Sequence, residues 1–271
     1  MKTMKVDVLG LDGKPDGKAD VPDVFEVGLR PDLIKRAFWL VGSHGFQPKG
    51  RDPMAGERTT AETHSPPTGT GQSRIPRVKG SRYSRSGMAG GVASTVKGRL
   101  PHPPRSEKVI HFKINKKERR LATESAIAYT ADLESVKARG HRVKATSLPL
   151  VVTDDIETVE KTTELVKFLE KAQMSEELER LYGGIKRNSG HARLRGRAYR
   201  NRVGPLFVVT NDRGLGRASG AIPGIDVVRV DDLSILDLAP GGVPGRLTLW
   251  TESSIATLAA PKKEVEMTVA A

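Results

Sequence analysis

Segment 41–106 most strongly limits the folds open to this chain, because it can hardly build a hydrophobic core. It holds eleven glycines, eight prolines and only two aromatic residues, Phe46 and Tyr83. Such a composition buries too little apolar surface to offset the entropy of ordering the chain. A structureless insert of this length is uncommon inside a domain, and is usually functional or disordered. We therefore expect residues 42–106 to form an extended irregular loop.

The formal net charge of +13 over 271 residues is concentrated in two places. Segment 41–106 has eleven cations against three acidic residues, and segment 183–204 has seven cations and no acid. The rest of the chain is close to neutral. A flexible linker would account for the first segment only if it were weakly charged, which it is not. The distribution therefore favours a polyanionic partner.

Arginine supplies eight of the eleven cations in the first segment and six of the seven in the second. Arginine binds phosphate through two parallel hydrogen bonds and stacks on bases, which a merely soluble surface does not need. RNA is favoured over DNA because a long irregular loop suits folded RNA, and no helix-turn-helix or zinc-finger pattern is present. A DNA-compacting protein remains an alternative. The cations predicted to contact RNA are Arg51, Arg58, Arg74, Arg77, Lys79, Arg82, Arg85, Lys97, Arg99 and Arg105, followed by Lys186, Arg187, Arg193, Arg195, Arg197, Arg200 and Arg202.

The remainder of the chain alternates between strand and helix patterns. Strands are expected at residues 5–11, 108–114, 148–153, 206–210, 225–230 and 246–250, and helices at 31–42, 115–139, after Asp154 or Asp155, and at 252–259. Strands separated by helices are typical of an α/β fold with a mainly parallel sheet flanked by helices. The long loop is then an insertion after the first helix. We predict a globular domain from residues 1–41 and 107–260, and a flexible tail over 261–271.

The helix expected at 115–139 has Asn115 as its N-cap and Gly140 as its stop. Its apolar stripe is predicted to consist of Leu121, Ser125, Ala128, Leu133 and Val136. In the next helical region, the buried face is predicted from Ile156, Val159, Leu165, Val166 and Leu169. Glu176, Glu177 and Glu179 are expected on a solvated helix face.

An enzyme is the main rival hypothesis. Gly214-Leu215-Gly216 with Gly220 follows a strand and resembles a dinucleotide-binding turn, with Asp231 further on. About ten residues separate Gly214 from Ile225, too few for the crossover helix of a parallel connection, so a turn with one or two helical turns is predicted instead. An RNA-modifying enzyme with a nucleotide cofactor stays as the alternative. The acidic pairs Asp154-Asp155 and Asp231-Asp232 fit active-site carboxylates or helix N-caps.

Other site classes have little support in the sequence. The chain has no cysteine, and its six histidines are dispersed. We expect no metal and no cofactor. No apolar run approaches the ~18 residues that a membrane span needs. Gly69 and Gly71, inside the basic loop, follow no strand and are expected to allow a tight bend or a close approach to another surface.

Several further motifs stand out along the chain. They are Asn115-Lys-Lys-Glu-Arg-Arg-Leu-Ala122, Ser125-Ala-Ile127, Arg139-Gly-His141, the segment Gly69-Thr-Gly-Gln-Ser-Arg74-Ile-Pro-Arg77-Val-Lys79-Gly80, His102-Pro-Pro-Arg-Ser-Glu-Lys108, Arg195-Gly-Arg-Ala-Tyr-Arg200 and Ala239-Pro-Gly-Gly-Val-Pro-Gly-Arg246-Leu-Thr-Leu-Trp250-Thr-Glu-Ser. Together these motifs resemble the L-four family of large-subunit ribosomal proteins, in the form found in archaea and eukaryotes, and the segment from Gly69 to Gly80 resembles the tip of that family's loop. Tyr129 stands where a small residue is expected.

This resemblance implies a structural, non-enzymatic component of the large ribosomal subunit. Its α/β domain would lie near the outer surface of the subunit, and its loop would pass through ribosomal RNA to the peptide exit tunnel. There the tip would form the constriction with a second tunnel protein. Gly69 and Gly71 would let the backbone approach RNA closely, and the arginines of both segments would contact it. The implied partners are ribosomal RNA and neighbouring ribosomal proteins in the cytoplasm, with no membrane and no homo-oligomer.

Overall fold

The computed structural model describes residues 4–63, 65–82, 84–144 and 147–259. The chain divides into two units: a sheet unit, Met1–Gly42 with Lys113–Ala271, and an inserted unit, Ser43–Phe112. The tail expected over residues 261–271 lies outside the described residues.

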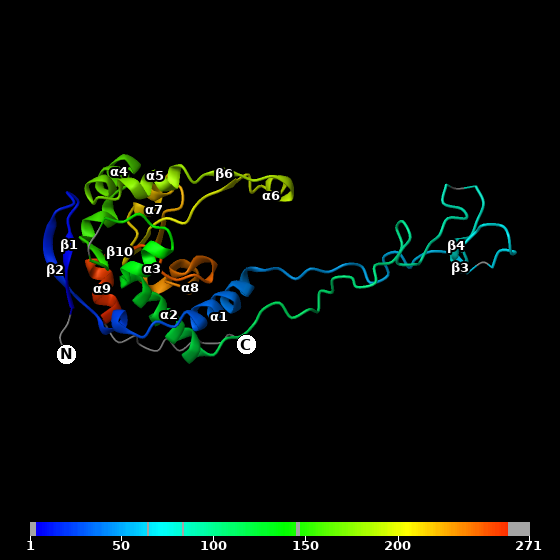
Figure 1. The fold of residues 1–271 in the computed structure, drawn as a ribbon, viewed down its shortest axis with the longest axis horizontal. Helices are drawn as coiled ribbons and strands as arrows, with labels where there is room; N and C mark the ends of the chain where they lie inside the picture. Colours follow the sequence, from blue (N-terminus) through cyan, green and yellow to red (C-terminus); the bar gives the residue numbers. More distant parts are fainter. Residues whose placement is uncertain (1–3, 64, 83, 145–146, 260–271) are drawn as a thin grey trace. The chain divides into compact units, whose positions relative to one another are not determined.

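The sheet unit is built on a six-stranded sheet (Figure 1). Its order is β2 (Pro15–Val21), β1 (Met4–Leu9), β5 (Leu150–Val152), β10 (Thr248–Thr251), β8 (Leu206–Val209) and β9 (Asp226–Arg229). β1 and β2 are antiparallel, and every other pairing is parallel. The α/β class with a mainly parallel, helix-flanked sheet is therefore confirmed. β5 and β8 are buried on both faces, as expected for central strands of a parallel sheet.

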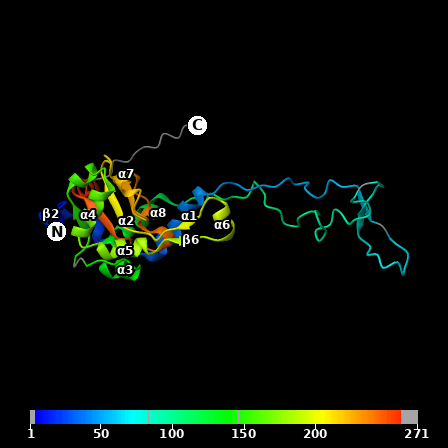
Figure 2. The ribbon, with the colours of Figure 1, turned by 90° about the horizontal axis from the view of Figure 1, so that it is seen from above.

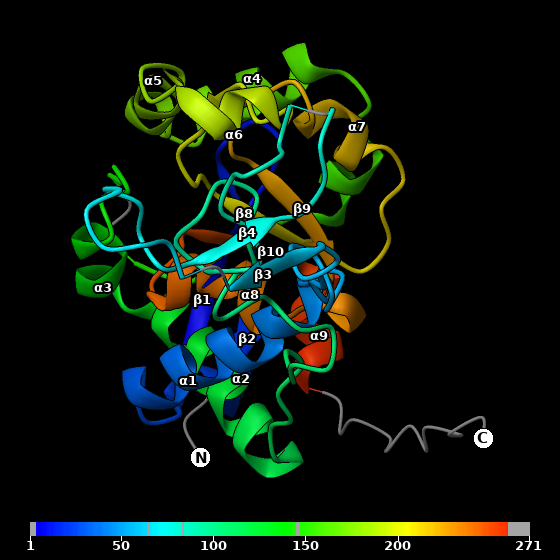
Figure 3. The same cartoon turned by 90° about the vertical axis from the view of Figure 1, so that its right-hand side faces the viewer.

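Two hydrophobic cores lie on opposite faces of this sheet. Alternate residues of one strand serve different cores: Phe207 points to the first and Val208 to the second. The first core is covered by α3 (Leu133–Ala138), α4 (Thr162–Lys171), α5 (Ser175–Tyr182) and α7 (Leu215–Ser219). The second is covered by α1 (Pro31–Gly42), α2 (Lys116–Ala131), α8 (Ile235–Leu238) and α9 (Glu252–Ala259). Figure 3 shows α4, α5 and α7 on one side of the sheet and α1, α2 and α9 on the other.

Short 3-10 helices connect several of these elements. They span Asp23–Glu26, Ser43–Gly45, Asp154–Thr158, Val230–Asp232 and Pro240–Gly242. Trp250 of β10 is fully buried in the second core and packs edge-to-face on Phe25, with ring centroids 5.4 Å apart. Tyr129 of α2, at a position where the sequence motif favours a small residue, lies partly buried against the same core.

Two predicted elements are wrong. Residues 108–114 alternate in polarity but form no strand. Val109 and Phe112 are 71% and 51% exposed, and only Ile114 at the end of the segment packs against a core. The helix predicted at 115–139 is two helices, because Asp132 leaves helical geometry and caps α3 through the N–H groups of Glu134 and Ser135. Leu121, predicted in its apolar stripe, is 51% exposed.

The buried face of α4 is confirmed, since Leu165 and Leu169 are buried and Val166 packs against the core.

The inserted unit has little core of its own. β3 (Ala61–Thr63) pairs antiparallel with β4 (Pro76–Val78), and among the residues described in this unit the buried apolar side chains are those of Val78 and Pro66. Its two ends are joined: the Phe112 N–H donates to Ser43 Oγ at 3.1 Å. The stacked rings of His44 and His111 bond through Nε2 to the carbonyls of Phe112 and Phe46, each at 3.0 Å. We call this joint the histidine clasp.

Candidate RNA interface

The second basic segment forms a hairpin on the sheet unit. β6 (Lys186–Arg187) pairs antiparallel with β7 (Tyr199–Arg200), and α6 (Gly190–Leu194) lies between them. Asn188 closes the hairpin, since its N–H and Nδ2 donate to the carbonyls of Ala198 and Arg197 at 2.9 Å. Figures 1 and 2 show the hairpin extending away from the sheet and its helices.

All seven cations of the hairpin are exposed, and none makes a side-chain hydrogen bond or ion pair with the described part of the chain. They are Lys186, Arg187, Arg193, Arg195, Arg197, Arg200 and Arg202. Two large apolar side chains are exposed beside them, Leu194 at 82% and Tyr199 at 63%. Like charges held together without counter-charges repel one another, and a polyanion removes this repulsion. An exposed tyrosine ring among arginines adds a surface on which a base can stack.

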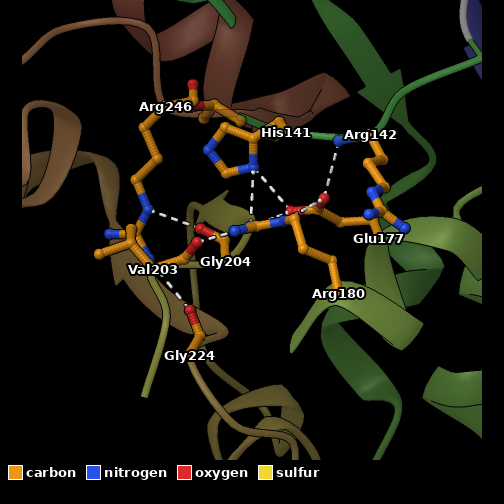
Figure 4. A network of polar contacts seen from close by, with 9 residues as sticks. His141, Arg142, Glu177, Arg180, Val203, Gly204, Gly224 and Arg246 are labelled. Carbon is orange, nitrogen blue, oxygen red and sulfur yellow. Dashed lines mark hydrogen bonds and ion pairs between the residues drawn. The ribbon is translucent and has the colours of Figure 1, made fainter. Parts of the chain in front are cut away.

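A buried polar network anchors the chain that leaves this hairpin (Figure 4). Arg180 of α5 donates through Nη2 to the carbonyl of Val203 at 2.7 Å, and Arg246 donates through Nε to the carbonyl of Gly204 at 2.8 Å. The Arg246 guanidinium also bonds to the carbonyl of Asp237 at 2.9 Å and to the carboxylate of Asp226 at 2.5 Å. These bonds fix the backbone at the end of the exposed segment.

Glu177 is the acid at the centre of this network. Its carboxylate accepts from Arg180, from His141 Nδ1 at 2.6 Å and from the Arg142 N–H at 2.9 Å, and its side chain is 1% exposed. The prediction that Glu177 lies on a solvated helix face is therefore wrong, whereas its neighbour Glu176 is exposed and pairs with Lys144. The i,i+3 spacing of Glu177 and Arg180 on one helix was the available sequence indication.

Burial and hydrogen bonding set the charges in the network. Burial lowers the pKa of His141 below its ordinary value, more than the Glu177 carboxylate raises it. His141 is therefore neutral and donates Nδ1–H to Glu177. Burial would raise the pKa of Glu177, but hydrogen bonds from Arg180, His141 and the Arg142 N–H outweigh it and lower that pKa to about 2. The ionised Glu177 therefore supplies the counter-charge of the Arg180 guanidinium.

The ten cations of the inserted unit that are predicted to contact RNA fall into two groups. Four are engaged by their own unit: Arg58 with Asp52 at 2.6 Å, Lys79 with Glu62, Arg77 with the carbonyls of Gly87 and Ser73 at 3.0 and 3.3 Å, and Arg85 with the carbonyl of Val96 at 3.4 Å. The others are exposed and make no such contact with the described residues. They are Arg51, Arg74, Arg82, Lys97, Arg99 and Arg105.

Gly69 and Gly71, in the turn between β3 and β4, have positive φ angles of 94° and 69°. Only glycine adopts this geometry without strain. A Cβ atom at either position would meet no described atom within 4 Å, so both faces of this turn are open.

The carboxyl edge of the sheet, where an α/β enzyme places its site, is occupied by structural contacts. Glu157 accepts from the N–H of Thr210 at 2.9 Å, and Asp154 accepts from the N–H of Ser253 in the first turn of α9 at 3.0 Å. Asp154 thus caps α9, and not the helix that directly follows it in the sequence. Asp231 and Asp232 pair with Arg229.

The turn at Gly214 is the short one predicted from the sequence. It leads into the five-residue helix α7, and Asp212 Oδ1 accepts from the N–H groups of Gly214 and Gly216 at 3.1 and 3.0 Å. A carboxylate of the chain itself therefore occupies the position where a phosphate would bind in a nucleotide site. Among the described residues, no cluster of histidine, aspartate or glutamate could hold a metal ion, and no helix is long and apolar enough to span a membrane.

Comparison with known proteins decides the family. The model of the "Ribosomal protein L4/L1 family" matches residues 19–261. The chain belongs to the ribosomal protein L4/L1 family. Large ribosomal subunit protein uL4 of Methanococcus aeolicus is 43% identical over 255 residues, covering 93% of this chain and 97% of that protein. The uL4 proteins of Sulfurisphaera tokodaii and Methanocaldococcus jannaschii are 41% and 43% identical, covering 95% and 94% of this chain and 95% and 98% of their own lengths.

Membership of the L4/L1 family confirms the resemblance drawn from the sequence motifs, and the relatives compared are archaeal, in agreement with the predicted form shared by archaea and eukaryotes. The structure shows what two residues of the motif Arg139-Gly140-His141 do. Arg139 bonds to the carbonyl of Pro240 at 2.7 Å, and His141 belongs to the buried network. Tyr199 and Leu194 are exposed within the basic segment and are further candidate contacts that the charge pattern alone did not predict.

Proposed function

We propose that this chain is a structural protein of the cytoplasmic large ribosomal subunit that binds ribosomal RNA through its hairpin and its inserted unit. The observation that carries this proposal is the set of seven exposed hairpin cations with no counter-charge. Family membership supports it, because the relatives compared bear the name of a large-subunit protein. Six of the predicted contacts in the inserted unit, those that its own residues do not engage, supply a second set of phosphate contacts.

The relation between RNA affinity and salt tests this proposal. Each phosphate that the protein no longer neutralises lowers the slope of log affinity against log salt by about 0.7 to 0.9. Replacing Arg193, Arg195 and Arg197 by glutamine should lower the slope for ribosomal RNA by about two to three units. A control variant replaces Lys5, Lys161 and Lys171, which pair with Asp20, Glu164 and Asp12, and changes the net charge equally. Equal slopes for the two variants would contradict the proposal.

The same measurement separates the two groups of cations in the inserted unit. The triple replacement of Arg51, Arg74 and Arg82 by glutamine should lower the slope by about two to three units. Replacing Arg58, Arg77 and Lys79 should lower it less, because each is held by its own unit. A larger effect of the second set would mean that these internal contacts open on RNA.

We further propose that the turn carrying Gly69 and Gly71 reaches the peptide exit tunnel and narrows it together with a neighbouring ribosomal protein. The open faces of this turn and its two positive φ angles support a close approach to another chain. Because the chain has no cysteine, Thr70→Cys gives a single attachment point for a cross-linker. In ribosomes stalled in translation, this position should cross-link to the nascent peptide, whereas Ser189→Cys in the hairpin should not. Cross-linking from both or neither would contradict the placement.

A further inference from the structure

The inserted unit contains a cleft of about 380 Å³ between two antiparallel arms of chain, residues 51–57 and 99–107. This volume is within the range of small-ligand sites. Its wall includes Ala55, Leu100 and four prolines, at positions 53, 101, 103 and 104. Prolines restrict the backbone and offer flat apolar faces, so this wall suits a planar group.

Glycine contacts close the arms at both ends of the cleft. A Cβ atom on Gly56, whose φ is +86°, would lie 2.5 Å from the carbonyl carbon and oxygen of Gly98. At the other end, a Cβ atom on Gly50 would lie 3.3 Å from Ser106 Cβ. The backbones thus touch where side chains are missing and separate between these points. The positions of Gly50 and Gly56 therefore set the two ends of the cleft.

The charged groups of the cleft are of both signs. Asp52 is already satisfied, since it accepts from Arg58 at 2.6 and 3.1 Å and from the Met54 N–H at 3.1 Å. Arg51, Arg99 and Arg105 and the carboxylates of Glu57 and Glu107 have no side-chain partner among the described residues. Carboxylates would repel a lone phosphate, and three guanidinium groups would repel a metal cation, so neither ion alone fits this set of charges.

A nucleotide has both complements: a phosphate that accepts hydrogen bonds and a base edge that can donate them. We propose that this cleft receives one unpaired nucleotide of ribosomal RNA. Its phosphate binds the arginines, its base lies against the proline wall, and an exocyclic amino group donates to Glu57 or Glu107. Adenine, cytosine and guanine carry such a group, and uracil does not. The inference rests on the proposed function and adds a site for a single base to it.

Chemical probing of ribosomal RNA bound by the full-length protein tests this assignment. Reagents that together modify unpaired bases of all four kinds, uracil included, are applied to RNA alone and to RNA with each variant. Ala55→Trp fills the cleft with an indole and leaves every charge in place. Ala93→Trp, at an exposed position of the same unit outside the cleft, is the matched control. Binding is measured in parallel by filter retention at fixed salt.

With the native protein, one unpaired base should lose its reactivity. With Ala55→Trp, that base alone should become reactive again, and affinity should fall about tenfold, as expected for the loss of one stacked base. Ala93→Trp should behave as the native protein. If Ala55→Trp restores no base, or restores a uridine, the nucleotide assignment is wrong while RNA binding stands. If the native protein itself protects nothing, the proposed function fails.

A second variant covers the case in which Ala55→Trp abolishes all binding. Arg51→Gln keeps most of the side-chain volume and removes one charge of the cleft. It should expose the same base and leave the protections elsewhere in the RNA in place. A uniform loss of protection with Arg51→Gln would show that this arginine only contributes to general phosphate contact, and would overturn the proposal.

Discussion

Glu177 holds the base of the basic hairpin in place through a single carboxylate with three donors. Replacing it by glutamine keeps the shape but leaves the buried Arg180 guanidinium without a counter-charge, which costs about 3 kcal/mol of stability. Urea denaturation followed through the fluorescence of buried Trp250, in a Trp39→Phe background, would measure this. The control is Glu176→Gln, whose ion pair with Lys144 is exposed and screened by solvent, so its stability should change much less. Equal effects at the two positions would contradict the role given to Glu177.

The same network makes stability depend on pH in a defined direction. His141 has a lowered pKa in the folded state, so the unfolded chain binds more protons once the pH falls below about 6.5, the ordinary histidine value. Glu177, lowered to about 2, adds a further loss between its ordinary value of 4.5 and about 2. The urea midpoint of the sheet unit should therefore fall steadily below pH 6.5. With His141→Gln, the part of this fall between pH 6.5 and 5 should be smaller; an unchanged profile would assign the dependence to other groups.

At the scale of elements, the junction of α2 and α3 depends on Asp132. Its carboxylate accepts from the N–H groups of Glu134 and Ser135 at 3.3 and 3.2 Å. Asp132→Ala should destabilise the sheet unit by about 1 kcal/mol, the usual cost of losing an N-cap. Thermal denaturation by circular dichroism would measure it, with the exposed neighbour Glu134→Ala as the control. No loss of stability in Asp132→Ala would mean that packing alone sets the break.

The central strands were predicted from apolar runs that reflect burial on two sides. β5 and β8 are continuous apolar runs, and both proved central. β2 was not predicted, since only Ala19 and Val21 of its seven residues are buried and the rest of this edge strand is polar. The break at Asp132 was missed because the apolar spacing continues through it. The helix α2 ends because the Asp132 carboxylate accepts hydrogen bonds from the next turn of backbone, and the spacing of apolar residues carries no information about such a bond.

The candidate interface was predictable to a similar extent. The density of arginine was visible in the sequence, and the hairpin cations are exposed as a polyanion-binding surface requires. Which cations of the inserted unit are engaged internally was not predictable. The pairs Arg58–Asp52 and Lys79–Glu62 depend on how a turn and a strand pair bring these residues together.

At the scale of the whole molecule, the uneven distribution of core predicts uneven resistance to proteases. Trypsin should cut the free protein first between Gly42 and Arg105 and within the hairpin, because exposed arginines there lie outside the two hydrophobic cores. The fragments on either side of the inserted unit should stay associated, since α1 and α2 pack on the same core. Gel filtration of the digest would show this. Binding to ribosomal RNA should protect both segments, and early cleavage within the sheet would contradict the expectation.

The histidine clasp has a consequence for how such chains diversify. Its hydrogen bonds join Ser43, His44 and Phe46 to His111 and Phe112 and require nothing from the residues in between. Insertions or deletions matched on the two arms beyond the clasp leave it intact. Related proteins can therefore differ in the length of the inserted unit while the histidine clasp at its two ends keeps the same structure.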